Sequence, residues 1–161
     1  MKKIVNVAGN IIAAVFAAIG VLCISVTITV MFRPLYYFDI DYLDIPRMSG
    51  MSEAVIRANY DVLIDYNLLG GPSELNFPDL IMSQQGRIHF EEVKDIFIFM
   101  QIFSIAAVIL LVLWIVAGVK KKSLSFKWMK FTGIVIAIIA STCGCALIID
   151  WDWAFTAMHT I

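Results

Sequence analysis

The chain's two histidines, His89 and His159, are the side chains best suited to acid–base chemistry. His89 opens the stretch HFEEVKDIF, which continues into a long apolar segment, and His159 follows the last apolar segment. Imidazole titrates near neutral pH, so two histidines can serve as base and acid in acyl transfer. Hydrogen-bonded structural histidines are the alternative. A metal site with Asp95 or Asp152 is less favoured, because no H-E-x-x-H or similar ligand spacing occurs.

Other motifs for covalent chemistry are missing from the sequence. It contains no G-x-S-x-G string and no Gly-rich phosphate loop, so acyl transfer would proceed without a nucleophile from the protein. Cys23, Cys143 and Cys145 lie in apolar runs, which favours helix packing over a disulfide framework or a zinc site. The sequence indicates no cofactor and no metal.

Composition indicates a membrane protein. The chain is 61% hydrophobic and 16% charged, whereas soluble domains are roughly half apolar and a quarter charged. Spans of about 20 apolar residues can cross a bilayer as helices, and three are predicted, at 4–32, 96–119 and 131–149. The first favours an uncleaved anchor, because its apolar part exceeds the roughly 7–15 residues of a signal peptide.

Charge predicts the orientation of these spans. The N-terminal tail and the 120–130 loop contain lysines but no acidic residues: Lys2 and Lys3 in the tail and five lysines in the loop. Residues 33–95, by contrast, contain eleven acidic residues. The positive-inside rule puts the lysines in the cytoplasm, and residues 33–95 and 150–161, with both histidines, outside. The acidic segment gives no support for nucleic-acid binding. The predicted fold is an all-α membrane protein with three transmembrane helices and an extracytoplasmic, mainly helical cap.

Local signals predict the helices of the cap. Ser52 is typical of a helix N-cap, the pair Arg57 and Asp61 has the i,i+4 spacing of an ion pair, and the sequence GGP ends this helix. Gly86 predicts a turn, after which the helix of the second span opens at His89.

Three strings together resemble the lipoprotein intramolecular transacylase family of Firmicute membranes. They are NYDVLIDYN, the stretch LNFPDLIMSQQGRIHFEEVKDIF and the late DWDWAFTAMHTI. Within them, H-F-x-x-V-K-x-x-F begins at His89, and F-x-x-x-H joins Phe155 to His159. The resemblance implies a cell-membrane enzyme with four membrane helices and an extracellular cap. It also implies that the sn-2 acyl chain of a diacylglyceryl group moves to the α-amine of the lipoprotein's own N-terminal cysteine, giving a lyso-form lipoprotein.

The resemblance implies His89 and His159 as the catalytic residues. The further candidates for the substrate pocket are Tyr60, Tyr66, Phe90, Lys94, Asp95 and Phe155. Packing in the cap core is the alternative for each aromatic residue, and Asp95 orients a histidine, caps the span or pairs with Lys94. The expected partners are a diacylated lipoprotein and membrane lipid; the sequence leaves the oligomeric state open.

The chain departs from the family pattern at its C-terminal end. The family continues past its second histidine into a fourth span, whereas this sequence stops at Thr160-Ile161. We therefore expect a C-terminally truncated family member that keeps both histidines. The alternatives are an inactive fragment of the enzyme and a non-enzymatic multi-pass membrane protein whose acidic cap binds a partner.

Overall fold

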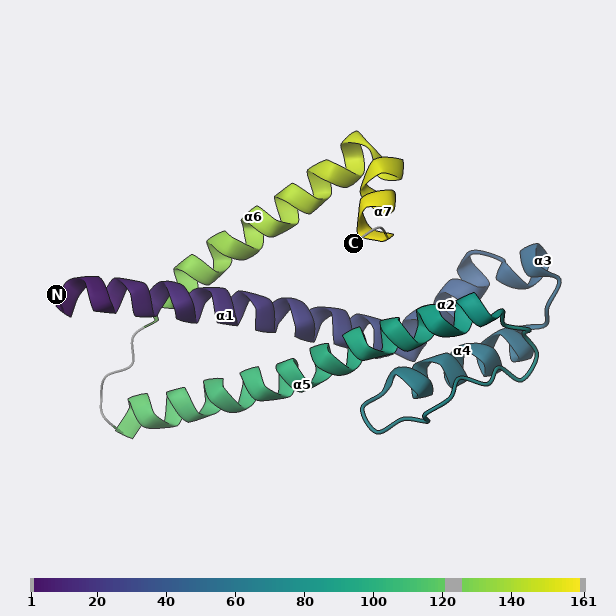
Figure 1. Ribbon diagram of the computed structural model, residues 1–161, viewed down its shortest axis with the longest axis horizontal. Helices are drawn as coiled ribbons and strands as arrows, with labels where there is room; N and C mark the ends of the chain where they lie inside the picture. Colours follow the sequence, from purple (N-terminus) through teal and green to yellow (C-terminus); the bar gives the residue numbers. More distant parts are fainter. Residues whose placement is uncertain (1, 121–125, 160–161) are drawn as a thin grey trace. The chain divides into compact units, whose positions relative to one another are not determined.

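The computed structural model describes residues 2–120 and 126–159, with the side chains of 2–9, 147, 154 and 157–159 excepted. This part of the chain is helical and contains no strand (Figure 1). Its helices are α1 Lys2–Met31, α2 Arg33–Tyr42, α3 Ile45–Ser49, α4 Glu53–Asn67, α5 Gln84–Lys120, α6 Lys127–Ile149 and α7 Trp151–His159. Two compact units result: the cap-side unit, Cys23–Val108, and the span-side unit, Met1–Leu22 with Ile109–Ile161.

Three helical stretches have the length and apolar character needed to cross a bilayer: Asn10–Met31, Gln84–Lys120 and Lys127–Ala146. They contain or overlap the three predicted spans and confirm a multi-pass membrane fold. As predicted, one helix runs from the cap into the second span: α5 has 37 residues and continues through residue 95. A helix of that length extends about 55 Å, well beyond a hydrocarbon core of about 30 Å.

The start of α5 differs from the prediction. Gly86 lies within the helix and does not form a turn, because Ser83 caps the helix instead. The Gly86 amide donates to Ser83 Oγ at 3.0 Å, and the Arg87 amide donates to the Ser83 carbonyl at 3.0 Å. His89 therefore lies in the second turn of α5 rather than at its start.

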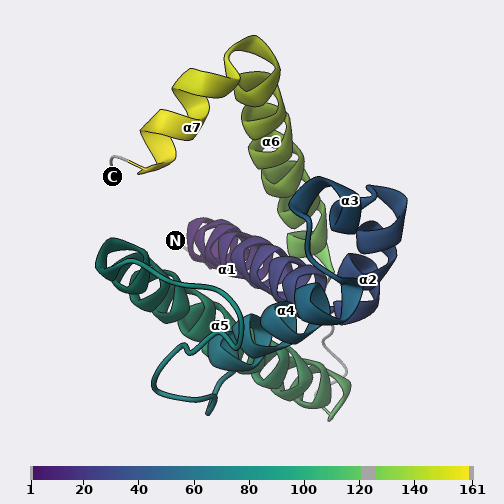
Figure 2. The same ribbon diagram turned by 90° about the vertical axis from the view of Figure 1, so that its right-hand side faces the viewer.

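The cap-side unit is built from short helices around α4. Ser52 caps α4 as predicted, accepting a hydrogen bond from the Val55 amide at 3.4 Å. The helix ends at Asn67, and Gly70 then adopts a φ of 81°, which glycine tolerates best. Helices α2, α3 and α4 pack together, and α4 lies beside the N-terminal half of α5 (Figures 1 and 2). The buried apolar residues of this unit include Ile40, Ile56, Ile64, Tyr66 and Leu75.

The span-side unit relies on small residues and few polar contacts. Ala14 and Ala18 of α1 are buried, and Thr132 Oγ1 of α6 bonds the Ala14 carbonyl at 3.4 Å. The packing prediction for the cysteines holds for Cys23, which is buried. It is wrong for the cysteines at 143 and 145, which are exposed on α6.

Helix α7 follows a sharp break in the chain. Asp150 adopts an extended conformation, with φ −154° and ψ 96°, and ends α6. Its carboxylate then accepts the Trp153 amide at 2.8 Å, so the same residue caps α7. The segment 150–161, predicted only as an extracytoplasmic stretch, is helical up to His159.

Candidate functional site

The cap-side unit contains a cavity of about 370 Å³. The end of α1, the linker after it, α2, α4 and α5 all contribute to its wall, which is mostly apolar and aromatic. Its lining residues are Thr29, Val30, Phe32, Leu35, Tyr36, Asp39, Tyr60, Leu63, Ile64, Asn67, Phe90, Val93 and Phe97. An apolar cavity with a few polar groups is the usual form of a site for a small molecule or a lipid chain.

His89 of α5 is not among the lining residues; it directly precedes Phe90, which is one of them. Phe90, Val93 and Phe97 recur at i, i+3 and i+7, so they share the face that lines the cavity. His89 lies one turn before Val93 at the margin of that face. Its imidazole is exposed, and its ring centroid lies 6.0 Å from that of Phe90. Phe77 meets Phe90 edge-on at 6.0 Å and holds that ring from the loop side.

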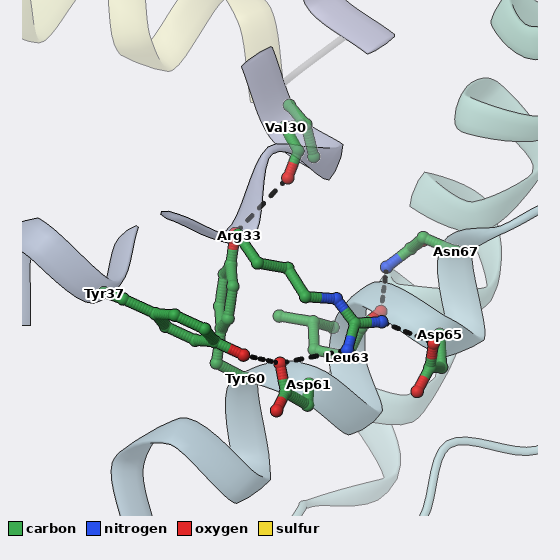
Figure 3. Close-up of polar contacts among 8 residues, drawn as sticks. All are labelled: Val30, Arg33, Tyr37, Tyr60, Asp61, Leu63, Asp65 and Asn67. Atoms are coloured by element: carbon green, nitrogen blue, oxygen red, sulfur yellow. Dashed lines mark hydrogen bonds and ion pairs between the residues drawn. The ribbon is translucent and has the colours of Figure 1, made fainter. Parts of the chain in front are cut away.

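Two stacked tyrosines form a second wall. Tyr36 of α2 stacks on Tyr60 of α4 with ring centroids 4.0 Å apart. The Tyr60 hydroxyl donates to the Val30 carbonyl at 3.3 Å, near the end of α1 (Figure 3). Burial raises the pKa of Tyr60, so its hydroxyl stays protonated and keeps this hydrogen bond. The bond fixes the end of the first span against α4.

A charged network lies close to this wall (Figure 3). The Arg33 guanidinium contacts Asp61 at 3.1 Å and Asp65 at 2.5 Å, and the Tyr37 hydroxyl donates to Asp61 at 2.5 Å. The hydrogen bond to the Asp61 carboxylate raises the pKa of Tyr37. These contacts join the start of α2 to the middle of α4.

Arg57 does not form the predicted pair with Asp61. Its guanidinium contacts Glu53 at 2.5 Å, one turn earlier on α4, and lies 4.4 Å from the centre of the Tyr37 ring. The prediction is wrong: the Asp61 carboxylate bonds Arg33 and Tyr37 instead, both through Oδ1.

Polar groups also connect α4 to the second span. Gln101 of α5 is 8% exposed; it donates to the Asn67 carbonyl at 2.8 Å and accepts from the Leu69 amide at 2.9 Å. The side-chain amide of Asn67 donates to the Leu63 carbonyl at 2.8 Å, and no described residue donates to its Oδ1. Gln101 thus satisfies backbone groups where α4 ends.

The other candidates from the sequence lie in different settings. Tyr60 and Phe90 line the cavity. Tyr66 is 2% exposed in the cap core, with Lys94 Nζ 4.2 Å from its ring centre. Lys94 also donates to the Pro72 carbonyl, and Asp95 is exposed on the same helix. Core packing, the alternative weighed for Tyr66, therefore describes that residue.

The second predicted catalytic residue belongs to the span-side unit. His159 is the last residue of α7, and its side chain lies outside the described part of the structure. Phe155 stacks on Trp151 with ring centroids 6.4 Å apart and is 47% exposed. The pairing of His89 with His159 stays a prediction.

Three polar residues of the cap-side unit were not predicted from the sequence. Asp39 and Asn67 line the cavity, and Gln101 holds the end of α4. A glutamine inside an apolar span is a signal in its own right, since polar residues there usually have an internal partner. The sequence around Asp39 and Asn67 gives no comparable indication of a buried role, because acidic and amide residues are common in a polar segment.

Comparisons with known proteins identify relatives of the chain. A family model for the lipoprotein intramolecular transacylase Lit matches residues 11–161. A comparison with curated protein sequences found no significant match.

The solved structures provide three matches, all of the membrane-integral lipoprotein intramolecular transacylase Lit from Bacillus cereus. One has 30% identity and a TM-score of 0.82, and the match covers 94% of this chain and 69% of that one. Two others, in which a histidine of that protein is replaced by arginine or alanine, have 28% identity and a TM-score of 0.83. These cover 99% of this chain and 70% or 71% of theirs. The chain therefore belongs to the lipoprotein intramolecular transacylase family, whose name describes acyltransferases that act on lipoproteins.

Proposed function

We propose that this protein transfers the sn-2 acyl chain of a diacylglyceryl-modified lipoprotein to the α-amine of its N-terminal cysteine, giving a lyso-form lipoprotein. Membership of the transacylase family carries the proposal. The lysine distribution supports an orientation with the N-terminus and the 120–130 loop in the cytoplasm and the cap-side helices outside. Lipoproteins in the outer leaflet then meet the cap where it joins the lipid.

His89 is the proposed base or acid on the cap-side unit. An α-amine has a pKa of about 7.7–8.0, so much of it is protonated at neutral pH and must lose a proton before it attacks. As the new N–C bond forms and the ester C–O bond breaks, that proton leaves the nitrogen and the glyceryl oxygen takes one up. A histidine that directly precedes a cavity-lining residue suits either transfer, and such transfers contribute about 10²–10⁴ in rate.

His159 is the proposed second group, because of the F-x-x-x-H motif at 155–159. Two histidines can divide the reaction, one accepting the amine proton and the other donating to the oxyanion or the leaving oxygen. Because donor and acceptor of the acyl chain belong to one molecule, orientation is a large part of catalysis. Well-held intramolecular reactants reach effective molarities of about 10⁵–10⁸ M.

The aromatic cavity supports the proposal, because its lining is mostly apolar. Tyr36, Tyr60, Phe90 and Phe97 form apolar walls against which an acyl chain can lie. Exclusion of water favours attack by the amine, since water would otherwise hydrolyse the ester and release a free fatty acid.

Mass spectrometry of a reporter lipoprotein tests the proposal. The N-terminal peptide is compared between cells with and without this chain, and between wild type and the variants His89→Ala and His159→Ala. We expect N-acyl, lyso-form peptide with the wild type and its loss in each variant. Unchanged product in either variant contradicts the role of that histidine. If wild-type cells make no N-acyl product, and reversal of cap charges alone alters the phenotype, the protein is a partner-binding membrane protein.

A further inference from the structure

Helix α2 carries apolar side chains on two opposite faces. The inner face contains Tyr36, which stacks on α4, and Ile40, whose side chain has no exposed surface. The outer face contains Leu35, Phe38 and Tyr42, which are 44%, 62% and 74% exposed. Their spacing of i, i+3 and i+7 makes these three an outer stripe on one side of the helix, opposite Ile40.

Acidic residues lie between the two faces. Asp39 and Asp41 precede and follow Ile40, and the helical turn of about 100° per residue puts them on opposite flanks of the outer stripe. A helix on a water-exposed surface usually presents polar and charged side chains on the side away from the core. On α2 that side is apolar, and a helix that is apolar on both sides is typically covered on both.

The outer stripe continues the exposed apolar surface of the first span. Asn10–Met31 has the length and apolar character of a membrane span, and Ile28 in its last turn is exposed. Phe32 is also exposed, and α2 begins at the next residue. Exposed large apolar side chains therefore recur every three or four residues from the span into α2, at positions 28, 32, 35, 38 and 42.

A bend at Phe32 directs α2 away from the line of the span. Phe32 has φ −83° and ψ 80°, which is not helical, and α2 leaves the axis of the last turns of α1 (Figure 1). The headgroup region is about 5–8 Å thick on each side of the bilayer. A straight continuation of α1 would raise Tyr42 about 15 Å above Phe32, beyond this region. An inclined helix keeps the outer stripe within it.

We propose that the outer stripe of α2 lies in the headgroup layer of the bilayer and holds the cap-side unit against the membrane. Phe38 and Tyr42 stack with ring centroids 5.5 Å apart, so they present one apolar surface. Aromatic side chains are typical of this depth, because the rings pack on lipid while a tyrosine hydroxyl reaches water or headgroups. This assignment depends on the membrane fold and not on the proposed reaction.

The flanking charges indicate which lipids fit. Interfacial helices often bind anionic lipid through lysine and arginine, whereas the outer stripe of α2 is flanked by Asp39 and Asp41. These carboxylates favour zwitterionic headgroups, which carry a choline or ethanolamine cation, over an anionic surface. A protein partner would have to remove water from both carboxylates, but the headgroup layer stays hydrated. The apolar surface of the stripe therefore supplies the attachment to zwitterionic lipid.

This placement also bears on the cavity. Phe32 and Leu35 line the cavity and are exposed as well, so the two surfaces share these residues. One side of the cavity then lies beside lipid, which suits the acylated substrate of the proposed function.

Spin-label accessibility measures the depth of the outer stripe. The full chain, with the exposed Cys143 and Cys145 replaced by alanine and the buried Cys23 retained, is labelled at one introduced cysteine in phosphatidylcholine vesicles. Oxygen concentrates in lipid and a nickel chelate stays in water. The ratio of their collision rates with the label therefore reports its depth.

We expect this ratio at Phe38→Cys and Tyr42→Cys to exceed that at Ile81→Cys severalfold and to approach that at Ile28→Cys in the span. Ile81 is the matched control, because it is apolar and fully exposed but precedes α5. The start of α5 lies about 18 Å of helix before residue 96, where the predicted span begins. Equal ratios at positions 38 and 81 would overturn the proposal.

Other occupants of the stripe give different results. Shielding of the labels from both reagents, with magnetic coupling between neighbouring labels, would show that a second copy of the chain covers the stripe. High salt should leave the ratio unchanged, because the outer stripe carries no charge. A rise in nickel accessibility at high salt would show that charges hold the helix. Either result would overturn the proposal.

A second substitution tests whether the apolar side chains hold α2 at this depth. With the label at Tyr42→Cys, Phe38→Ser should raise the nickel accessibility severalfold, whereas Asp41→Ser should leave it unchanged. Both replaced side chains are exposed and lie outside the cavity wall. Equal changes in the two variants would overturn the proposal. Because no acyl transfer is measured, these results are independent of the proposed function.

Discussion

The contacts inside the cap-side unit differ in kind from those inside the span-side unit. In the cap-side unit, charged and amide side chains join residues far apart in sequence, such as Arg33 with Asp61 and Gln101 with Asn67. In the described part of the span-side unit, the hydrogen bond between helices runs from Thr132 Oγ1 to the Ala14 carbonyl and is longer, at 3.4 Å. There the ring of Trp114 packs edge-on against that of Trp128 at 5.4 Å.

This difference follows from the two solvents that surround the chain. Lipid is as apolar as leucine, so helices in it associate through close packing of small residues and leave large apolar side chains exposed. Leu113 and Ile138, for example, are 58% and 59% exposed. At the water-facing end, directional polar contacts can fix each side chain. A cavity with a defined lining is therefore expected in the cap-side unit.

The largest effect that tests this comparison is expected from Gln101→Leu. The Leu69 amide loses its acceptor and the Asn67 carbonyl loses its donor. Both losses occur at a buried position, since Gln101 is only 8% exposed. Loss of buried hydrogen bonds with their partners left behind should cost about 2–4 kcal/mol. We expect a clear fall in Tm, measured by tryptophan fluorescence in detergent micelles.

Ser104→Ala is the control for this change. Ser104 lies one turn further along α5 and is 9% exposed. Its hydroxyl donates to the Met100 carbonyl of the same helix at 2.7 Å. Its loss should be small. Equal falls in Tm for the two variants would show that Gln101 does not couple α4 to the span.

The sequence predicted those parts of the fold that depend on local signals. The three spans follow from apolar runs, and the Ser52 cap of α4 follows from its residue type. The start of α5 was predicted wrongly because the turn signal of Gly86 was given more weight than the capping signal of Ser83. A serine three residues before that glycine is the clue that would have corrected it.

The interaction partners of individual side chains could not be predicted from the sequence, because tertiary packing decides them. Arg57 had two acids at helical spacing and contacts Glu53, whereas Asp61 bonds Arg33, which is 28 residues away in sequence. The cavity likewise appears only when α2, α4 and α5 pack together. Among the lining residues, local spacing therefore led to Phe90 but not to Asp39 or Asn67, and the role of His89 stays a prediction.

The second-largest effect is expected from Arg33→Met. Arg33 joins α2 to both Asp61 and Asp65 and is 31% exposed at its side chain, so solvent screens part of the interaction. We expect a loss of about 1 kcal/mol, near the upper end for partly exposed ion pairs. Arg47→Met is the matched control, because its partner Asp44 lies on the neighbouring turn and its side chain is 81% exposed. A larger fall in Tm for the Arg47 variant would contradict this ranking.

A smaller effect is expected in the span-side unit from Thr132→Val. The substitution keeps the shape of the side chain but removes the hydroxyl that bonds Ala14 at 3.4 Å and Trp128 at 3.1 Å. Hydrogen bonds between membrane helices average about 0.6 kcal/mol, so Tm should fall only slightly. A loss as large as that of Gln101→Leu would break the comparison, because it would make polar contacts equally important in both units.

The smallest effect is confined to alkaline pH and concerns Tyr37. Its hydrogen bond to Asp61 raises the pKa of its phenol above the ordinary value of 10.0. Because the folded-state pKa exceeds the unfolded one, this stabilisation is fully present below pH 10 and is lost as pH rises through the folded-state value. Tm of the wild type should therefore fall more steeply above pH 10 than Tm of Tyr37→Phe. Tyr42→Phe, at a ring that is 74% exposed, should retain the wild-type slope. Parallel curves for wild type and Tyr37→Phe would show that the phenol adds nothing to the Arg33 network.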